Sequence, residues 1–192
     1  MNRDPLQSGF PELVTKRLLL RQIKDEDAPL LHQYWTDPAV IEYLTLEPFK
    51  DIQETFNMIA LLNGLLEFNQ GIRWAITSQA DHVVIGTCGF HNLKPEHKRA
   101  ELGYELGKTF WKQGFMAEAL AAIIPYGFKI LNLNRIEAFV NFGNSNSTNI
   151  LKRIGFSLDG LLREYEFARG QFVDQYCYSL LKQDYDRRLQ QF

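Results

Sequence analysis

Hydrophobic residues recur along this chain with two different spacings, and the spacing predicts where strands and helices lie. Alternating or short continuous apolar runs indicate strands, whereas apolar residues three and four positions apart indicate helices. Strand-like runs occupy residues 17–23, 72–76, 82–90, 100–106, 136–142, 163–168 and 171–181. Helix-like spacing occupies residues 25–36, 51–66, 115–128 and 148–154.

The order of these elements predicts an α/β fold. It reads strand, two helices, three strands, helix, strand, helix, two strands, which indicates a mixed, mostly antiparallel sheet of about seven strands flanked by helices. Without a repeat or linker, residues 1–192 are expected to form a single domain, with a loose lead-in over residues 1–16. Asp25 is expected to cap the first helix, and the second is expected to begin near Asp51.

Composition narrows the class of protein. The chain has 192 residues, 45% hydrophobic and 23% charged, with 21 basic against 23 acidic side chains. This balance gives no overall field that would favour direct nucleic-acid binding. Cys88 and Cys177 lie far apart and are expected to be free thiols. There is no leader-like apolar region and no apolar run of about 18 residues, so we expect a soluble, cytoplasmic protein with no membrane partner.

The stretch from Glu101 to Ala119 carries the first sign of chemistry. It reads as a strand, a glycine-bearing turn at Gly114, and the start of an amphipathic helix. Such a turn directs unpaired backbone N–H groups and the positive end of a helix dipole to one place, which is a binding site for anions. No Gly-Lys-Ser/Thr follows the turn, so it is not a P-loop, and the three-glycine dinucleotide fingerprint is also missing.

Residues 111–116, Trp-Lys-Gln-Gly-Phe-Met, resemble the cofactor loop of the GNAT N-acetyltransferases, where Gln/Arg-x-x-Gly-x-Gly/Ala holds the pyrophosphate of acetyl-CoA. The Trp, the Gly followed by an aromatic residue, and Glu118–Ala119 look most like the branch that acetylates N-terminal amines of ribosomal proteins. A second motif, with Asn144, Ser147 and then Gly155–Phe156, resembles the same branch. With the early Arg17–Arg21 run, the resemblance covers nearly the whole chain.

The resemblance implies the GNAT fold and a cofactor cleft. The strands at 101–106 and 136–142 would splay apart around the pantetheine arm of acetyl-CoA, and the loop would bind the pyrophosphate. Asn144 would contact the pantetheine. The residues implied in cofactor binding are Glu105, Leu106, Gly107, Trp111, Lys112, Gln113, Gly114, Phe115, Met116, Ala117, Asn144 and Ser147. Trp111 and Met116 depart from the general pattern: Trp111 cannot reach phosphate as a cation, and Met116 is bulky where the family has a small residue.

Acetyl transfer to an amine needs a neutral nucleophile, a donor for the oxyanion and an acid for the departing thiolate. An N-terminal amine titrates near about 7.8 and a lysine near about 10.4, so deprotonating the lysine costs about 3.5 kcal/mol more. Glu101, Glu105 and Glu166 are the candidate bases, with solvated strand carboxylates as the alternative. Ser147 is the candidate acid, although Asn144 and Ser147 also suit a helix N-cap.

The sequence thus predicts an acetyl-CoA-dependent N-acetyltransferase that works by direct amine attack on the thioester, without a metal. The preferred acceptor is a protein N-terminal α-amine, as on ribosomal proteins. A small amine, such as a polyamine or an antibiotic-like compound, is the enzymatic alternative. A non-catalytic acyl-CoA-binding module is the alternative from another class, favoured by Met116. The oligomeric state is left open, with a homodimer as one candidate.

Overall fold

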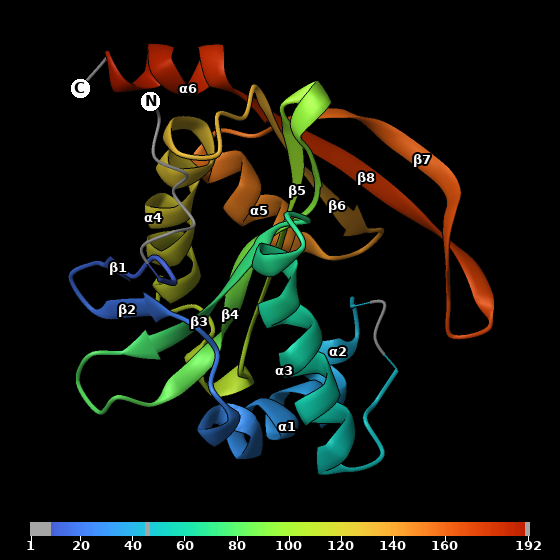
Figure 1. Cartoon of the computed structure of the whole chain (residues 1–192). Coiled ribbons are helices and arrows are strands. Elements are labelled where there is room, and N and C mark those ends of the chain that lie inside the picture. Colours follow the sequence, from blue (N-terminus) through green and yellow to red (C-terminus); the bar gives the residue numbers. More distant parts are fainter. Residues whose placement is uncertain (1–8, 45–46, 191–192) are drawn as a thin grey trace.

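Eight strands form one mixed sheet in the computed structural model, which describes residues 9–44 and 47–190 (Figure 1). The order across the sheet is β1-β2-β3-β4-β5-β6-β8-β7. β5 and β6 run parallel, and the other neighbouring pairs of described strands run antiparallel. The strands are β1 (Leu13–Val14), β2 (Leu18–Arg21), β3 (Ile72–Ser78), β4 (Val84–Lys94), β5 (Arg99–Leu106), β6 (Arg135–Asn141), β7 (Ser157–Ala168) and β8 (Gln171–Leu181).

Helices cover both faces of this sheet. They are α1 (Ala28–Thr36), α2 (Pro38–Ile41), α3 (Ile52–Glu67), α4 (Phe115–Lys129), α5 (Ser145–Ile154) and α6 (Lys182–Leu189). α4 and α5 pack on one face with most of the apolar strand residues, whereas α1 and α3 pack on the other around a smaller cluster. Trp74 and Ile76 of β3 face the first cluster and Ala75 faces the second, as the alternation of a strand requires.

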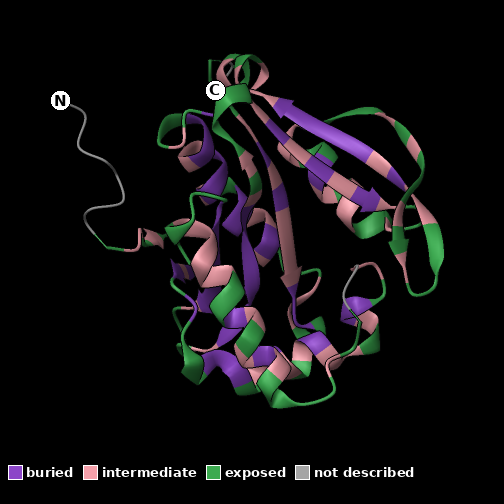
Figure 2. Cartoon of the chain, turned by 45° about the vertical axis from the view of Figure 1, so that its right-hand side comes forward, coloured by how far each residue is buried: buried purple, intermediate pink, exposed green. Residues whose placement is uncertain are grey.

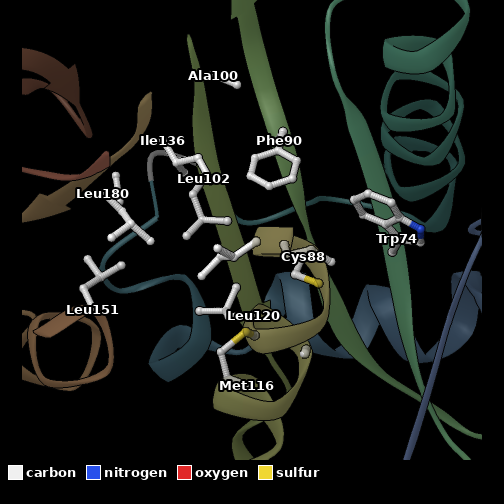
Figure 3. Packing of buried hydrophobic residues seen from close by; sticks show 14 of the residues in the cluster. Trp74, Cys88, Phe90, Ala100, Leu102, Met116, Leu120, Ile136, Leu151 and Leu180 are labelled. Atoms are coloured by element: carbon white, nitrogen blue, oxygen red, sulfur yellow. The ribbon is translucent and has the colours of Figure 1, made fainter. Parts of the chain in front are cut away.

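The larger core is built around α4. The helix buries Met116, Leu120, Ile123, Ile124 and Phe128, which is the stripe that its sequence predicts. Figure 3 shows Met116 and Leu120 pointing toward Leu102 and Cys88 of the sheet, with Leu151 of α5 beside them. Because α4 follows directly on the glycine turn, this packing fixes the direction in which the start of the helix points.

The start of the first helix corrects one expectation. α1 begins at Ala28, after a 3₁₀ turn over Asp25–Asp27, so the predicted cap at Asp25 is wrong. Asp27 is the buried carboxylate instead: it pairs with both terminal nitrogens of Arg21 at 2.7 Å and accepts from the Lys24 N–H at 2.8 Å. The expectation for α3 is confirmed, because the Asp51 side chain accepts from the Gln53 and Glu54 N–H groups.

Residues 9–17, which precede β2, are better ordered than their sequence predicts. Within the predicted lead-in, β1 pairs with β2, and the Trp74 indole donates to the Pro11 carbonyl at 2.7 Å. These contacts come from distant parts of the chain, so local composition does not indicate them. β1 is also why the sheet has eight strands instead of seven, and the short helices α2 and α6 were likewise not predicted. Residues 1–8 and 45–46, covered by the predicted lead-in and a predicted loop, lie outside the described residues.

The long hairpin of β7 and β8 forms one edge of the sheet and extends beyond the helices (Figure 1). Its outer part is largely exposed, in contrast to the buried middle of the sheet (Figure 2). No helix within residues 9–44 and 47–190 is long and apolar enough to cross a membrane. The same residues contain no group of three His, Cys, Asp or Glu side chains arranged to hold a metal ion.

Candidate active site

A cleft opens where β5 and β6 separate. The two strands pair only between Arg99–Glu101 and Arg135–Glu137, although β5 continues to Leu106 and β6 to Asn141. Beyond Glu101, β5 stays paired with β4 and β6 with β8. The cleft between them has a volume of about 1340 Å³ and is lined by residues of both strands, α5 and the glycine turn. The predicted splay of these strands is therefore present.

The register of β5 determines which backbone groups face this cleft. The Gly107 N–H donates to the Ile85 carbonyl at 2.9 Å, on the β4 side. In an antiparallel pair, alternate residues turn their backbone groups toward the same neighbour, so Glu105 also faces β4. Tyr104 and Leu106 then turn their N–H and C=O groups toward the open side. Apart from the Leu106 carbonyl, which accepts from Trp111, these are free partners for the amides of an extended ligand.

Of the three residues predicted to hold the pantetheine through their backbone, this register leaves only Leu106 available. Both backbone groups of Gly107 are already bonded, because its N–H donates to Ile85 and its carbonyl accepts from the Phe110 N–H at 2.9 Å. The backbone groups of Glu105 face β4 instead of the cleft. The Leu106 carbonyl accepts from the Trp111 indole at 2.8 Å, so the Leu106 N–H is the group left for a ligand. Trp111 thus links β5 to the loop before α4 through this hydrogen bond.

The turn before α4 has the geometry of an anion site. Gly114 is the N-cap with φ of 82°, in the left-handed region that favours glycine, and Lys112 has φ of 60°. The first helical bond runs from the Glu118 N–H to the Gly114 carbonyl at 3.1 Å. The N–H groups of residues 115–117 therefore have no helical acceptor and lie at the positive end of a 15-residue helix.

The loop side chains divide between the cleft and the protein body. Gln113 does not line the cleft, because its side chain donates to the Thr109 carbonyl at 2.7 Å. The loop residues that line the cleft are Trp111, Lys112, Gly114, Phe115, Met116 and Ala117. Met116 is 5% exposed and its side chain packs in the core beside Leu120 (Figure 3). Its bulk is therefore directed away from the anion site, and its N–H stays available.

Arg17, which the sequence left as an ordinary strand residue, holds this loop in place. Its guanidinium donates to Glu118 Oε2 at 2.6 Å and to the Gln113 carbonyl at 3.0 Å, and it lies 4.3 Å from the centre of the Phe115 ring. Glu118 Oε1 also accepts from the Arg17 N–H at 2.8 Å and from the Thr15 hydroxyl at 2.6 Å. The start of β2 is therefore tied to both sides of the anion turn.

Replacing Glu118 by Gln is expected to raise the KM for acetyl-CoA about fivefold, with kcat nearly unchanged, because a contact of about 1 kcal/mol that orients the loop is weakened. Burial raises the pKa of Glu118, but its bonds to Thr15 and Arg17 outweigh this and lower it. Its stabilising contribution is thus present above the ordinary carboxyl value of about 4.3 and is lost as the pH falls through the lower folded value.

Steady-state kinetics with varied acetyl-CoA would measure this change. Thermal melts at pH 7 and below pH 4 should show the difference in stability between wild type and E118Q shrinking in acid. Asp186→Asn is the matched control, since its 2.5 Å pair with Lys182 is of the exposed i, i+4 type and lies on α6. An unchanged KM in E118Q would contradict the role assigned to the Arg17–Glu118 contact.

Tyr104 and Ser147 meet on the α5 side of the cleft. Their hydroxyl oxygens are 2.6 Å apart, and both residues line the cleft with Asn144. Burial raises the pKa of Tyr104 to about 12, against a lowering from the Ser147 bond, so its hydroxyl keeps its proton at neutral pH. Asn144 caps α5 by accepting from the Ser147 N–H at 3.1 Å, which confirms the N-cap interpretation. Tyr104 was not among the predicted site residues; its signal in the sequence is a hydroxyl at a strand position that alternates with Leu102 and Leu106.

Glu105 is not free to act as a base. It forms an ion pair with Arg73 in which the two side chains are 8% and 10% exposed. The Thr87 hydroxyl and the Trp35 indole also donate to Glu105, the latter at 3.2 Å. The carboxylate is thus held by a cation and two further donors of the cleft wall. Glu105 is therefore corrected from a candidate base to a structural residue of the cleft wall.

Glu101 lies on the same face of β5, as a regular strand requires, and it is also paired. Its Oε1 is 3.0 Å from His91 Nε2, and its Oε2 accepts from the Asn92 side chain at 2.9 Å. Burial raises the pKa of Glu101, but the bonds to His91 and Asn92 together lower it below the ordinary value. Glu101 stays ionised at neutral pH and lines the cleft.

Glu166 approaches the cleft from the hairpin. It lies on β7 opposite Val173, next to a register shift between Leu162 and Glu166. Its carboxylate accepts from the Gln175 side chain, which also donates to Asn141 Oδ1 at 2.8 Å. The structure thus brings Glu166, Glu101 and Ser147 to one cleft, on different walls.

The geometry agrees with what comparison with known proteins shows. A model of the acetyltransferase (GNAT) domain matches residues 17–157. An uncharacterized N-acetyltransferase of Bacillus licheniformis, p20, is 46% identical over 173 residues, covering 90% of this chain and 97% of the relative. The chain therefore belongs to the GNAT acetyltransferase family, and it is an N-acetyltransferase that uses acetyl-CoA.

More distant relatives differ in their acceptors. The ribosomal protein uS5-alanine N-acetyltransferase of Escherichia coli is 25% identical, covering 93% of this chain and 96% of the relative. The spermidine N(1)-acetyltransferase of the same species is 26% identical and covers 80% of each chain. The crystal structure of RimL, a ribosomal L7/L12 alpha-N-protein acetyltransferase, has a TM-score of 0.81 at 23% identity, covering 90% of this chain and 94% of RimL. That likeness shows the fold.

Proposed function

We propose that this enzyme acetylates the N-terminal α-amine of a protein, with a ribosomal protein as the preferred acceptor. The observation that carries the proposal is the state of the cleft carboxylates. Glu105 is paired with Arg73, and the pKa of Glu101 is lowered by its bonds to His91 and Asn92 despite its burial. A site with weak bases suits an amine that titrates near about 7.8 better than one near about 10.4.

The electrostatics of the cleft support the same acceptor. A polyamine carries several positive charges and is favoured by unpaired carboxylates. Here Arg73 and Lys94 line the cleft, and Arg73 already neutralises Glu105. An N-terminal segment has one charge at its end, followed by peptide groups that hydrogen-bond to polar walls.

Acetyl-CoA is proposed to lie with its pantetheine in the gap between β5 and β6. The amides of the arm would meet the backbone of Tyr104 and Leu106, and Asn144 would contact the arm from α5. The pyrophosphate would meet the N–H groups of residues 114–117, with Lys112 beside it. Free backbone groups on β5 and at the start of α4 support this arrangement, since they suit the amides and the phosphates of the ligand.

Ser147 is proposed to protonate the departing thiolate, and Tyr104 to restore the serine proton through their 2.6 Å contact. The proton that the amine nitrogen loses on forming the amide returns through water to Tyr104. The amine nitrogen attacks the thioester carbon, the C–N bond forms, and the C–S bond then breaks. Glu101 and Glu166 are the carboxylates on the acceptor side of the cleft. No covalent enzyme intermediate is needed.

The acceptor is tested by the release of CoA thiol with a matched set of amines. The set contains a peptide beginning with Ala or Ser, the same peptide with a blocked N-terminus and one internal Lys, and spermidine. We expect kcat/KM for the free N-terminus to exceed the other two by at least about tenfold, since the α-amine is more often neutral at pH 7. Preferred acetylation of spermidine would replace this proposal with the small-amine alternative. A ribosomal acceptor would place the reaction in the cytoplasm.

A further inference from the structure

His91 lies on the acceptor side of the cleft and has no role in the chemistry proposed above. It lies near the end of β4, directly opposite Glu101 on β5, and both side chains line the cleft. The His91 side chain is 33% exposed and that of Glu101 is 22% exposed. The pair is therefore partly buried yet open to a ligand, on the sheet face opposite to the Tyr104–Ser147 contact.

The contacts of Glu101 orient the imidazole ring. Glu101 Oε1 lies 3.0 Å from His91 Nε2, and Asn92 donates to Oε2 and holds the carboxylate from the other side. A carboxylate at Nε2 selects the tautomer in which that nitrogen carries the proton. Nδ1 is then the nitrogen with a lone pair. The arrangement is that of a base oriented by an acid, as in catalytic triads.

Gly103 makes room for the His91 ring beside β5. A Cβ atom placed on Gly103 would lie 2.9 Å from His91 Cε1 and 3.2 Å from its Nδ1. Any other residue would therefore displace the ring. Gly103 is flanked by Leu102 and Tyr104, and the backbone of Tyr104 faces the gap assigned to the thioester arm. The ring, which lines the cleft, thus lies beside the strand that borders this gap.

The charged groups around His91 come from three strands. Glu101 on β5 contacts Nε2. Arg73 on β3 is also near, because its Nη1 lies 2.7 Å from the same Cβ position on Gly103. Glu105 on β5 is paired with Arg73, and Lys94 on β4 lines the cleft. Groups of both signs therefore surround the ring.

We propose that His91 Nδ1 removes the proton from the acceptor ammonium, with Glu101 as its positioning residue. The inference rests on acetyl transfer to an amine but not on which amine is used. The ammonium gives one proton to Nδ1, and the neutral amine attacks the thioester carbon. The nitrogen releases its second proton to water as the C–S bond breaks, the thiolate takes a proton from Ser147, and water returns one proton to the Tyr104–Ser147 pair. The imidazolium then releases its proton to water. Glu101 thus changes from a candidate base to the group that orients one.

His91→Asn and His91→Gln test the assignment. Both variants should lower kcat/KM about 100- to 1000-fold on the amine that wild type acetylates fastest, and should remove the acidic limb of the pH profile. Glu101→Gln should lower kcat/KM less and keep the acidic limb, because the ring stays in place but loses the carboxylate that orients it. A fluorinated analogue of the same amine, which is neutral at lower pH, should lose much less in the His91 variants. His97→Gln, 65% exposed on its side chain, is the control.

The affinity for CoA and the thermal stability should be unchanged in the His91 variants, which separates loss of the base from loss of the site. If His91→Gln keeps the acidic limb and Glu166→Gln removes it, the proton acceptor is Glu166 and the inference is overturned. It is also overturned if the fluorinated amine suffers the same loss as its parent. If wild type prefers spermidine to the peptide, the proposed acceptor is wrong. The kcat/KM of the His91 variants is then compared with that of wild type using spermidine as the acceptor.

Discussion

Replacing Glu105 by Ala is expected to lower the free energy of unfolding by about 3–5 kcal/mol, because it leaves the Arg73 guanidinium as an unpaired buried charge. The two side chains are 8% and 10% exposed, so little water reaches them to replace the lost partner. The substitution also removes the acceptor for the Thr87 hydroxyl and the Trp35 indole. Both donors would then lie in the wall between β4, β5 and α1 without their carboxylate.

Urea denaturation followed by tryptophan fluorescence and circular dichroism would measure this loss. Glu26→Ala is the matched control, since its 3.2 Å pair with Lys24 is more than half exposed and should change stability by less than about 1 kcal/mol. The double variant Arg73→Met, Glu105→Leu should recover much of the loss, because it removes both charges together. A stability of E105A within about 1 kcal/mol of wild type would contradict the buried-pair interpretation.

Replacing Trp74 by Ala is expected to cost about 3–5 kcal/mol through the cavity that the indole leaves. Trp74 is fully buried and packs edge-on against Phe10, Phe90 and Tyr126, at ring-centre distances of 6.1, 6.5 and 5.2 Å. These neighbours come from the segment before β1, from β4 and from α4. Loss of the ring would therefore loosen the N-terminal segment and the sheet–helix contact together.

Denaturant unfolding of two variants separates the ring from its hydrogen bond. Trp74→Phe keeps an aromatic ring but loses the 2.7 Å bond to the Pro11 carbonyl, so it should cost distinctly less than W74A. Leu158→Ala, at a half-exposed position on the outer hairpin, should be nearly neutral. Equal losses in W74A and W74F would show that the bond to the N-terminal segment, and not the packing, carries the effect.

Much of the fold could be predicted because its elements have strong local signals. The stripe on α4 and the start of α3 near Asp51 are patterns of neighbouring residues, and both were confirmed. β1 and the buried Asp27 were missed because each depends on distant or burial-driven partners: β1 on pairing with β2, and Asp27 on Arg21 in the core. Periodicity carries no information on such contacts.

The candidate site likewise has parts that the sequence predicts and parts that depend on distant contacts. The glycine turn at Gly114 and the Asn144 cap lie within short motifs, so their local geometry followed from the sequence. The contact of Tyr104 with Ser147 joins residues 43 positions apart, and that of Arg17 with Glu118 joins residues 101 apart. In both pairs, nothing in the sequence near one residue indicates which residue it contacts.

By itself, the sequence determined the strand–turn–helix with its anion-binding start, because glycine conformation and helix polarity are properties of adjacent residues. The tertiary structure decided which chemical groups remain free in the cleft. The register of β5 against β4 turns Tyr104 and Leu106 to the gap and Glu105 to Arg73. It also sets Glu101 opposite His91. A shift of one residue would reverse every one of these directions, since successive side chains of a strand point to opposite faces.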